Sequence, residues 1–421
     1  MFTTTNFVKL KYLIIIYPLL ILTGPFFPDL FLTLISAFYI MYITKNKNWG
    51  NFLSKKYNKI FFVLYTILIL SSFFSEYLIY SLKTSILYIR YVFFINAIIF
   101  IYEGDKNLLE NFCQINFFTL IFVSFDTIFQ FYFGHNIIGL ETNNDYRMGS
   151  FFGKELIVGS YLSRLFPYLL IYLFFFNKDK TNQIVKFVPI IFIGVAIFLS
   201  GERTSFIFFL IAASAIFIIL KNKRILLIAS LIFLVISTYI ASKDTNLFSR
   251  MIHQTINQIY DFENKQIFFY SKEHTVLSMI SIRMFKENKI LGVGPKNFRH
   301  ECFDNPKKYE FLVNYKPDHF CSTHPHNIFF QFLSETGLMG LIFYLIFLIN
   351  VFWLFIKESK KNKKNIKLIF LLISLIISIM PFVPSGQFFN NWLSIYLFLN
   401  LGFIISELKS NSQYDLKNID K

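Results

Sequence analysis

Residues 60–74 read IFFVLYTILILSSFF, a run without a charged side chain. Similar runs occupy 184–200, where Lys186 is the one exception, and 225–241. Each run is close to the ~20 residues that a helix needs to cross the hydrocarbon core of a bilayer. Of the 421 residues, 55% are hydrophobic and 16% are charged, whereas soluble domains carry about 25% charged residues. The sequence therefore predicts an all-α, polytopic integral membrane protein.

The alternation of apolar runs with polar connections predicts about twelve transmembrane helices. Their approximate limits are 12–27, 29–44, 60–75, 84–102, 113–133, 156–176, 186–201, 204–220, 225–241, 337–356, 368–382 and 390–407. Lysines concentrate in the connections after the second, sixth, eighth and tenth of these spans. Because cytoplasmic connections carry an excess of Lys and Arg, we expect both termini to lie in the cytoplasm.

This topology divides the chain into three regions. Residues 1–241 form an N-terminal transmembrane bundle of about nine spans, 242–336 form one large extracytoplasmic loop, and 337–421 form a C-terminal bundle of about three spans. Within the loop, the apolar positions of residues 274–289 are typical of an amphipathic helix. The following Gly292-Val293-Gly294-Pro295-Lys296 lacks the spacing of a phosphate-binding P-loop, so we predict a tight turn there.

The formal net charge is +16, and a basic excess can indicate nucleic-acid binding. Here the excess comes from the lysines of the predicted cytoplasmic connections. The charge therefore describes membrane orientation, and we expect no nucleic-acid partner.

All seven histidines fall on the extracytoplasmic side of this topology or at its boundary. The densest group is Cys321-Ser322-Thr323-His324-Pro325-His326-Asn327. Imidazole exchanges a proton near neutral pH, which favours proton transfer by His324 or His326 over a purely structural hydrogen bond. The chain has no H-E-x-x-H motif and no Cys-x-x-Cys pair, so we expect no zinc site.

Several arginines are expected on the same side of the membrane. They are Arg147, Arg203, Arg283 and Arg299. The planar guanidinium group matches phosphate oxygens, so outward arginines suit a pyrophosphate at the membrane surface. The alternative is an internal salt bridge, for example between Glu202 and Arg203, and the same alternative applies to Arg90 and Arg164 within predicted spans.

Cys302 and Cys321 both lie in the predicted extracytoplasmic loop. An oxidising compartment permits a disulfide between them, which would contribute about 3 kcal/mol for a loop of this length. The bridge would connect the segment before His324 to the Arg299 region.

Four motifs in order resemble the bacterial O-antigen ligase and O-antigen polymerase family. They are Arg147-Met148-Gly149-Ser150-Phe151-Phe152-Gly153, Gly201-Glu202-Arg203-Thr204, Leu291-Gly292-Val293-Gly294-Pro295-Lys296-Asn297-Phe298-Arg299, and His326-Asn327 followed after nine residues by Gly337-x-x-Gly340. The last is similar to the family's H-[N/S/Q]-x9-G-x-x-G signature. The resemblance covers roughly residues 140–345, and the predicted topology extends it over the whole chain.

The resemblance implies a fold like the GT-C-type glycosyltransferases and a reaction without metal ion or cofactor. The donor would be a glycan on undecaprenyl pyrophosphate, and transfer would occur at the periplasmic face of the bacterial inner membrane. His326 would act as base or position the acceptor hydroxyl, and Arg203 would bind the pyrophosphate. Arg147, Arg299, His324 and Asn327 are expected to contact substrate. Arg283 and His274 are weaker candidates, because the family places a Gly-Arg pair near the position of His274.

Three functions remain open at this stage. A ligase would transfer the glycan to a lipid A core sugar, and a polymerase would transfer it to another lipid-linked glycan. A transporter or flippase of lipid-linked glycans would instead need charges along a path through the membrane, for which the sequence offers Lys83, Arg90, Asp126 and Arg164. We favour the ligase because of the spacing between His326-Asn327 and Gly337-x-x-Gly340.

Overall fold

The computed structural model describes residues 9–142, 147–177, 185–219, 223–243, 245–261, 266–267, 270–309, 320–361 and 365–417. Its α-helices in chain order are α2 (Lys11–Ile15), α3 (Tyr17–Leu22), α4 (Phe26–Lys45), α5 (Trp49–Ser54), α6 (Lys56–Phe73), α7 (Leu78–Tyr88), α8 (Arg90–Gly104), α9 (Leu108–Phe133), α10 (Val158–Ile171), α11 (Phe187–Leu199), α12 (Arg203–Ser214), α13 (Ile216–Ile219), α14 (Lys223–Lys243), α15 (Thr245–Phe248), α16 (Gln254–Ile259), α17 (Lys272–Glu287), α18 (Phe298–Asp304), α19 (Ile328–Glu335), α20 (Gly337–Lys360), α21 (Ile366–Ser378) and α22 (Asn391–Lys417).

Short irregular elements complete the described chain. They are 3₁₀ turns at Ser150–Glu155 and Pro306–Lys308, π-helical turns at Tyr172–Phe176 and Ser249–His253, and the strands β1 (Tyr260–Asp261) and β2 (Gln266–Ile267). The two strands pair antiparallel, with Tyr260 opposite Ile267. The fold is therefore almost entirely helical, as the apolar runs predict.

Of the described helices, six are long and apolar enough to cross a membrane. They are Phe26–Lys45, Leu78–Gly104, Leu108–Phe133, Val158–Phe176, Gly337–Lys360 and Asn391–Ser410. The predicted spans at 186–201, 204–220 and 368–382 correspond to shorter apolar helices, and the span at 225–241 lies within α14, of which Ser230–Tyr239 is the apolar part. The first predicted span is divided, since α2 and α3 are separate short helices and Gly24 follows with a φ of 91°. Six of the roughly twelve predicted spans are thus helices long and apolar enough to cross a membrane, and the others remain predictions.

The centre of the bundle consists of α8, α10, α21 and α22, which pack against one another and against α4 and α9. Every residue of α10 except Ser160 is buried, because other helices enclose this helix on all sides. By contrast, α20 exposes Ile342, Ile346, Ile349, Trp353 and Ile356. Their spacing of three and four residues defines one helix face, which suits contact with lipid.

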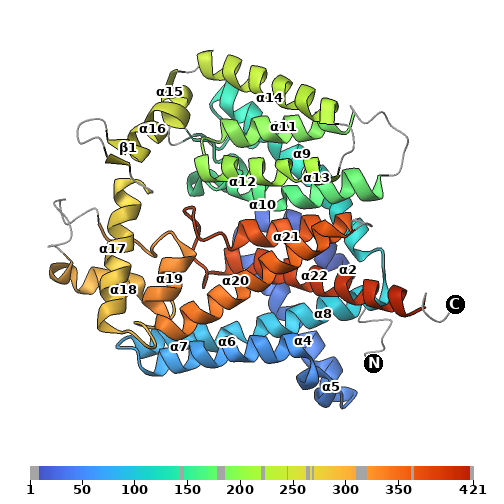
Figure 1. Ribbon diagram of the computed structural model, residues 1–421, viewed down its shortest axis with the longest axis vertical. Coiled ribbons are helices and arrows are strands. Elements are labelled where there is room, and N and C mark those ends of the chain that lie inside the picture. Colours follow the sequence, from blue (N-terminus) through green and yellow to red (C-terminus); the bar gives the residue numbers. More distant parts are fainter. Residues whose placement is uncertain are drawn as a thin grey trace.

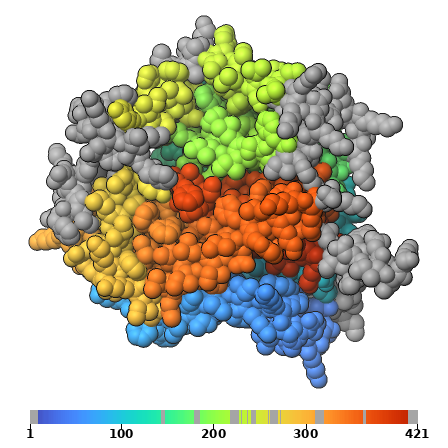
Figure 2. All heavy atoms as spheres, viewed as in Figure 1, coloured from blue at the N-terminus to red at the C-terminus, as the bar shows by residue number. Residues whose placement is uncertain are grey.

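Helices α17, α18 and α19 gather at one end of the bundle, opposite the C-terminal end of α22 (Figure 1). In the space-filling view, the surface of α20 and α21 forms a central band between the N-terminal helices below and α12 and α14 above (Figure 2). The amphipathic helix expected at 274–289 is present as α17, and it buries Val276, Leu277, Ile280 and Met284 in a separate small core.

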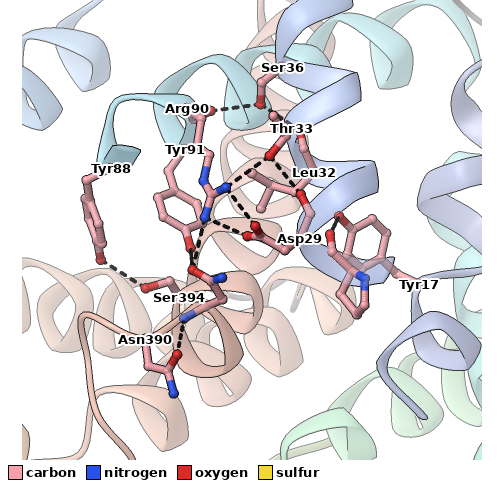
Figure 3. Close-up of polar contacts among 12 residues, drawn as sticks. Tyr17, Asp29, Leu32, Thr33, Ser36, Tyr88, Arg90, Tyr91, Asn390 and Ser394 are labelled. Carbon is pink, nitrogen blue, oxygen red and sulfur yellow. Dashed lines mark hydrogen bonds and ion pairs between the residues drawn. The ribbon is translucent and has the colours of Figure 1, made fainter. Parts of the chain in front are cut away.

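Arg90 forms an internal ion pair at the junction of three helices (Figure 3). Its Nη2 lies 2.6 Å from Asp29 Oδ1 of α4, and its Nη1 donates to Thr33 Oγ1 at 3.0 Å. Nη2 also donates to Asn391 Oδ1, at the start of α22. Arg164 instead donates to the Ser160 hydroxyl of its own helix. Arg90 therefore forms an internal salt bridge, the alternative to phosphate binding that the sequence offered.

We predict that Asp29→Ala lowers the free energy of unfolding by about 1–3 kcal/mol, because it leaves the Arg90 guanidinium without its counter-charge at a part-buried position. Thermal unfolding of the purified protein in detergent measures this change. The matched control is Glu103→Ala, which breaks the exposed pair with Lys409 (3.2 Å) and should change stability by less than about 1 kcal/mol. Equal effects of the two substitutions would contradict a structural role for the Arg90 pair.

Candidate functional site

The histidine motif forms a non-helical turn that is fixed at both ends. Cys321 forms a disulfide with Cys302 of α18, with the two Cα atoms 5.7 Å apart. At the other end, Asn327 caps α19 by accepting a hydrogen bond from the amide of Phe330 at 3.2 Å. The Asn327 amide also donates to the carbonyl of Pro381 at 2.7 Å. Asn327 therefore has a positioning role in the structure.

His326 lies within this turn in an unusual backbone conformation, with a φ of 52°. Non-glycine residues rarely adopt the left-handed region unless the surroundings hold them there. The surroundings here include Ser385, whose amide donates to the His326 carbonyl at 2.7 Å. The imidazole Nε2 lies 3.1 Å from Ser322 Oγ, and the ring centroid is 4.0 Å from that of His324.

A third histidine reaches this group from α17. Ser271 caps α17, and its hydroxyl lies 2.6 Å from His274 Nδ1. The ring centroid of His274 is 5.8 Å from that of His326. Tyr270, just before this cap, accepts a hydrogen bond from Asn327 Nδ2 at 3.3 Å. The start of α17 and the start of α19 are thus held together, and this contact brings His274 to His326.

All three imidazoles are held in the neutral form at pH 7. Burial and then the neighbouring His326 lower the pKa of His324 to about 3. Burial and then His274 lower the pKa of His326 to about 4. Burial, followed by the charge of Arg203, also lowers the pKa of His274. Among the described residues, no three His, Cys, Asp or Glu side chains are arranged to hold a metal ion.

Arg203 is the first residue of α12, and its Nη1 donates to Thr255 Oγ1 at 3.3 Å. Arg250, which belongs to none of the four sequence motifs, donates from Nε to the Gly201 carbonyl at 2.9 Å. Arg147 donates from Nη2 to the Leu156 carbonyl at 2.7 Å. Each guanidinium is therefore positioned by neutral oxygens, without a carboxylate partner among these bonds.

Electrostatic interactions show that the three arginines are close together. Burial and the charges of Arg147 and Arg203 lower the pKa of Arg250 to about 10. Burial lowers the pKa of Arg203, Glu273 opposes that shift, and the charge of Arg147 adds to it. Nε of Arg147 is buried and, in the described part of the chain, has no hydrogen-bond partner. Mutual repulsion and an unused donor favour an anionic ligand at this cluster.

Glu202 does not form the salt bridge with Arg203 that the sequence offered as an alternative. Its carboxylate accepts hydrogen bonds from the amides of Gly159 at 2.7 Å and Ser160 at 3.1 Å. It also accepts a bond from the Ser205 hydroxyl at 2.9 Å. Glu202 therefore joins α12 to the N-terminus of α10, where the unpaired amides of a helix favour a carboxylate.

The predicted turn at Gly292–Lys296 docks against the C-terminal end of α19. The amides of Val293 and Gly294 donate to the carbonyls of Ser334 at 2.9 Å and Glu335 at 3.0 Å. The buried Glu335 carboxylate accepts from the amides of Lys296 at 2.9 Å and Phe298 at 3.2 Å. Burial raises the pKa of Glu335 to about 7, and these amide donors oppose the shift.

Glycine is required on both sides of this contact. Gly337 has a φ of 62°, and a Cβ there would lie 2.5 Å from the carbonyl carbon and oxygen of Ile290. Gly292 has a φ of 70°, and a Cβ there would lie 2.5 Å from the carbonyl carbon of Glu335. The two motifs therefore pack backbone against backbone, which explains why glycine occurs in both.

The structure brings most of the sequence-predicted residues to one region, but it separates Arg283 from them. Arg283 lies nine residues after His274, roughly 13 Å further along α17, and its Nε is 2.7 Å from Glu287 Oε1. Arg299 lies on α18, where its charge contributes to lowering the pKa values of His324 and Glu335. Arg250 could have been noticed as another arginine of the predicted outer loop, although no motif marks it.

The family model described as O-antigen ligase matches residues 188–345. This segment contains Arg203, Arg250, His274 and His326, whereas Arg147 precedes it. The family resemblance inferred from the motifs is thereby confirmed. The comparison with curated proteins found no match.

We predict that Gly337→Ala destabilises the protein by at least about 2 kcal/mol, because the left-handed conformation alone costs a non-glycine residue about 1–2 kcal/mol and the clash is with backbone. Gly50→Ala is the control, since a Cβ at Gly50 meets no atom within 4 Å. Thermal unfolding in detergent compares the two variants. Wild-type stability of Gly337→Ala would show that the two motifs are not locked together as described.

Proposed function

We propose that this chain is a membrane glycosyltransferase of the O-antigen ligase type. It transfers a glycan from undecaprenyl pyrophosphate to a hydroxyl of a lipid A core sugar at the periplasmic face of the bacterial inner membrane. The main support is that an arginine cluster lies near neutral histidines. Apart from Arg147, these residues belong to the segment that matches the family model.

Arg147, Arg203 and Arg250 bind the donor pyrophosphate in this proposal. During transfer, the bond between the anomeric carbon and the pyrophosphate oxygen breaks, and negative charge develops on the leaving group. Preorganised guanidinium groups stabilise that charge without reorganisation. The lowered pKa of Arg250 supports the assignment, because an anion placed between the arginines relieves their repulsion.

His326 accepts the proton of the acceptor hydroxyl as the new glycosidic bond forms. A general base must be neutral before the reaction, and the lowered pKa of His326 meets that requirement at pH 7. Ser322 and the backbone contact from Ser385 fix the orientation of the ring. The charge of Arg203 lowers the pKa of His274, and a charge on His274 lowers the pKa of His326. Positive charge on either neighbour therefore opposes protonation of the histidine beside it.

A lipid-anchored donor explains why these groups lie at one end of the helical bundle. The segment from α17 to α19 lies opposite the C-terminal end of α22 (Figure 1). With both termini in the cytoplasm, this end faces the periplasm.

A polymerase would use the same donor chemistry with a different acceptor. Glycan chain lengths in a deletion strain distinguish a polymerase from a ligase. Single repeats on the core indicate a lost polymerase, and a bare core indicates a lost ligase.

We predict that His326→Ala and Arg203→Ala abolish transfer and that Arg250→Ala slows it by about 100-fold or more, the usual effect of removing one donor to a developing anion. Transfer to the core is measured in membranes that contain equal amounts of each variant. Lys286→Gln, an exposed change in the last turn of α17, is the control and should retain wild-type transfer. If His326→Ala or Arg203→Ala shows normal transfer, the substituted residue has no part in the mechanism.

The rate should also depend on pH in a characteristic way. Because the pKa of His326 is lowered to about 4, the base stays neutral as the pH falls through 6, and kcat/KM should decline only as the pH approaches 4. His274→Gln removes a charge that lowers this pKa, so the decline should move to higher pH. Rates measured between pH 4 and 8 test both statements. A decline centred near 6.5 in the wild type would contradict them.

A further inference from the structure

A second basic pocket lies apart from the arginine cluster and has no assigned role. Its volume is about 440 Å³, and it lies between α7, the start of α8, α18 and the segment before α22. Four cationic side chains line it, from Lys83, Arg90, Lys296 and Arg299. The outer connections of the predicted topology supply Lys83, Lys296 and Arg299, and Arg90 lies near the outer end of the predicted span 84–102. The pocket therefore opens on the same side of the membrane as the histidine turn.

The positive charges of the pocket are only partly balanced. Asp29 is the one carboxylate of the lining, and its carboxylate is already paired with Arg90 at 2.6 Å. Within the described part of the chain, no hydrogen bond or ion pair engages the ammonium groups of Lys83 and Lys296. Nε of Arg299 is buried without a hydrogen-bond partner there. A pocket of this kind attracts a multiply charged anion.

The electrostatics of Lys296 agree with this interpretation. Burial and then the charge of Arg299 lower the pKa of Lys296; the Glu335 carboxylate opposes the shift, and Lys83 adds to it. A bound phosphate would remove the repulsion among these three side chains.

The α7 side of the pocket, which we call its mouth, carries exposed apolar side chains beside a lysine. Tyr80, Lys83, Thr84 and Leu87 line it from α7, and their spacing places them on one face of that helix. Tyr80 is 60% exposed and Leu87 is 49% exposed. Apolar exposed side chains beside exposed Lys83 are typical of the boundary between lipid tails and headgroups. The mouth therefore suits a molecule with a lipid anchor and an anionic headgroup.

The pocket is connected electrostatically to the histidine turn. Arg299 lines the pocket, and its charge contributes to lowering the pKa of His324, whose ring is 4.0 Å from that of His326. In the view of Figure 1, α12 and α16 lie above the α17 to α19 group, whereas α7 lies below it. The arginine cluster and the second pocket thus approach the histidines from different elements.

We propose that this pocket binds a phosphate group of the lipid-anchored acceptor and so places the acceptor hydroxyl near His326. The inference rests on the proposed function, and it assigns the two basic regions to the two substrates. The arginine cluster takes the donor pyrophosphate, and the pocket takes the acceptor phosphate.

Binding of lipid A to the full-length protein in detergent tests the proposal directly. The probes are bisphosphorylated lipid A and the same lipid after removal of its phosphates. In the double variant Lys83→Gln/Lys296→Gln, the Kd for the phosphorylated probe should rise by at least about tenfold, because the loss of even one of the two charge-assisted hydrogen bonds has that effect. The Kd for the dephosphorylated probe should not change, and Lys286→Gln should bind both probes as the wild type does.

Three results would overturn the pocket assignment. They are unchanged binding of phosphorylated lipid A by the double variant, equal loss of both probes, and displacement of the lipid by inorganic phosphate at equal concentration. The last result would indicate a site for free phosphate. Transfer by the wild-type protein is measured in parallel with the KM for acceptor. If the wild type binds lipid A but transfers nothing, the proposed function fails while the pocket remains a lipid phosphate site.

Discussion

The site depends on how the short helix α19 is fixed at its two ends. At the C-terminal end, the buried Glu335 carboxylate and the carbonyls of Ser334 and Glu335 bind the backbone of the turn that follows α17. At the other end, Asn327 caps the helix and binds the carbonyl of Pro381. Because α19 has only two turns, fixing both ends determines where His326 points. Buried backbone amides need hydrogen-bond partners, and water has little access to an apolar bundle. Breaking these contacts is therefore costly.

A consequence is that one site is built from segments far apart in the chain. The contact between Tyr270 and Asn327 joins the starts of α17 and α19, and the contact between Arg250 and Gly201 joins the outer loop to the turn before α12. The resulting region carries unbalanced positive charge beside neutral imidazoles. In the proposed mechanism, that combination binds an anionic leaving group and leaves a base free to accept a proton.

Much of the site could be predicted from the sequence, since its residues lie in short motifs with a chemical meaning. The His326 motif and the Arg203 turn were identified in this way, and α17 was predicted from its apolar spacing. Arg250 was missed because its role comes from tertiary proximity to Gly201, which no local pattern encodes. The Glu335 contact was missed for the same reason. The number of spans was harder to predict, because apolar runs do not show where short helices break or where a helix is buried by protein instead of lipid.

The central claim is that this chain alone displaces pyrophosphate from a lipid-linked glycan. The most direct measurement uses the purified protein in liposomes that contain the undecaprenyl pyrophosphate donor and a lipid A core acceptor, with the product linkage determined by NMR. A single displacement predicts a glycan joined to the acceptor with inverted anomeric configuration, together with release of undecaprenyl pyrophosphate. Absence of product with both substrates present, or retention of configuration, would contradict the account.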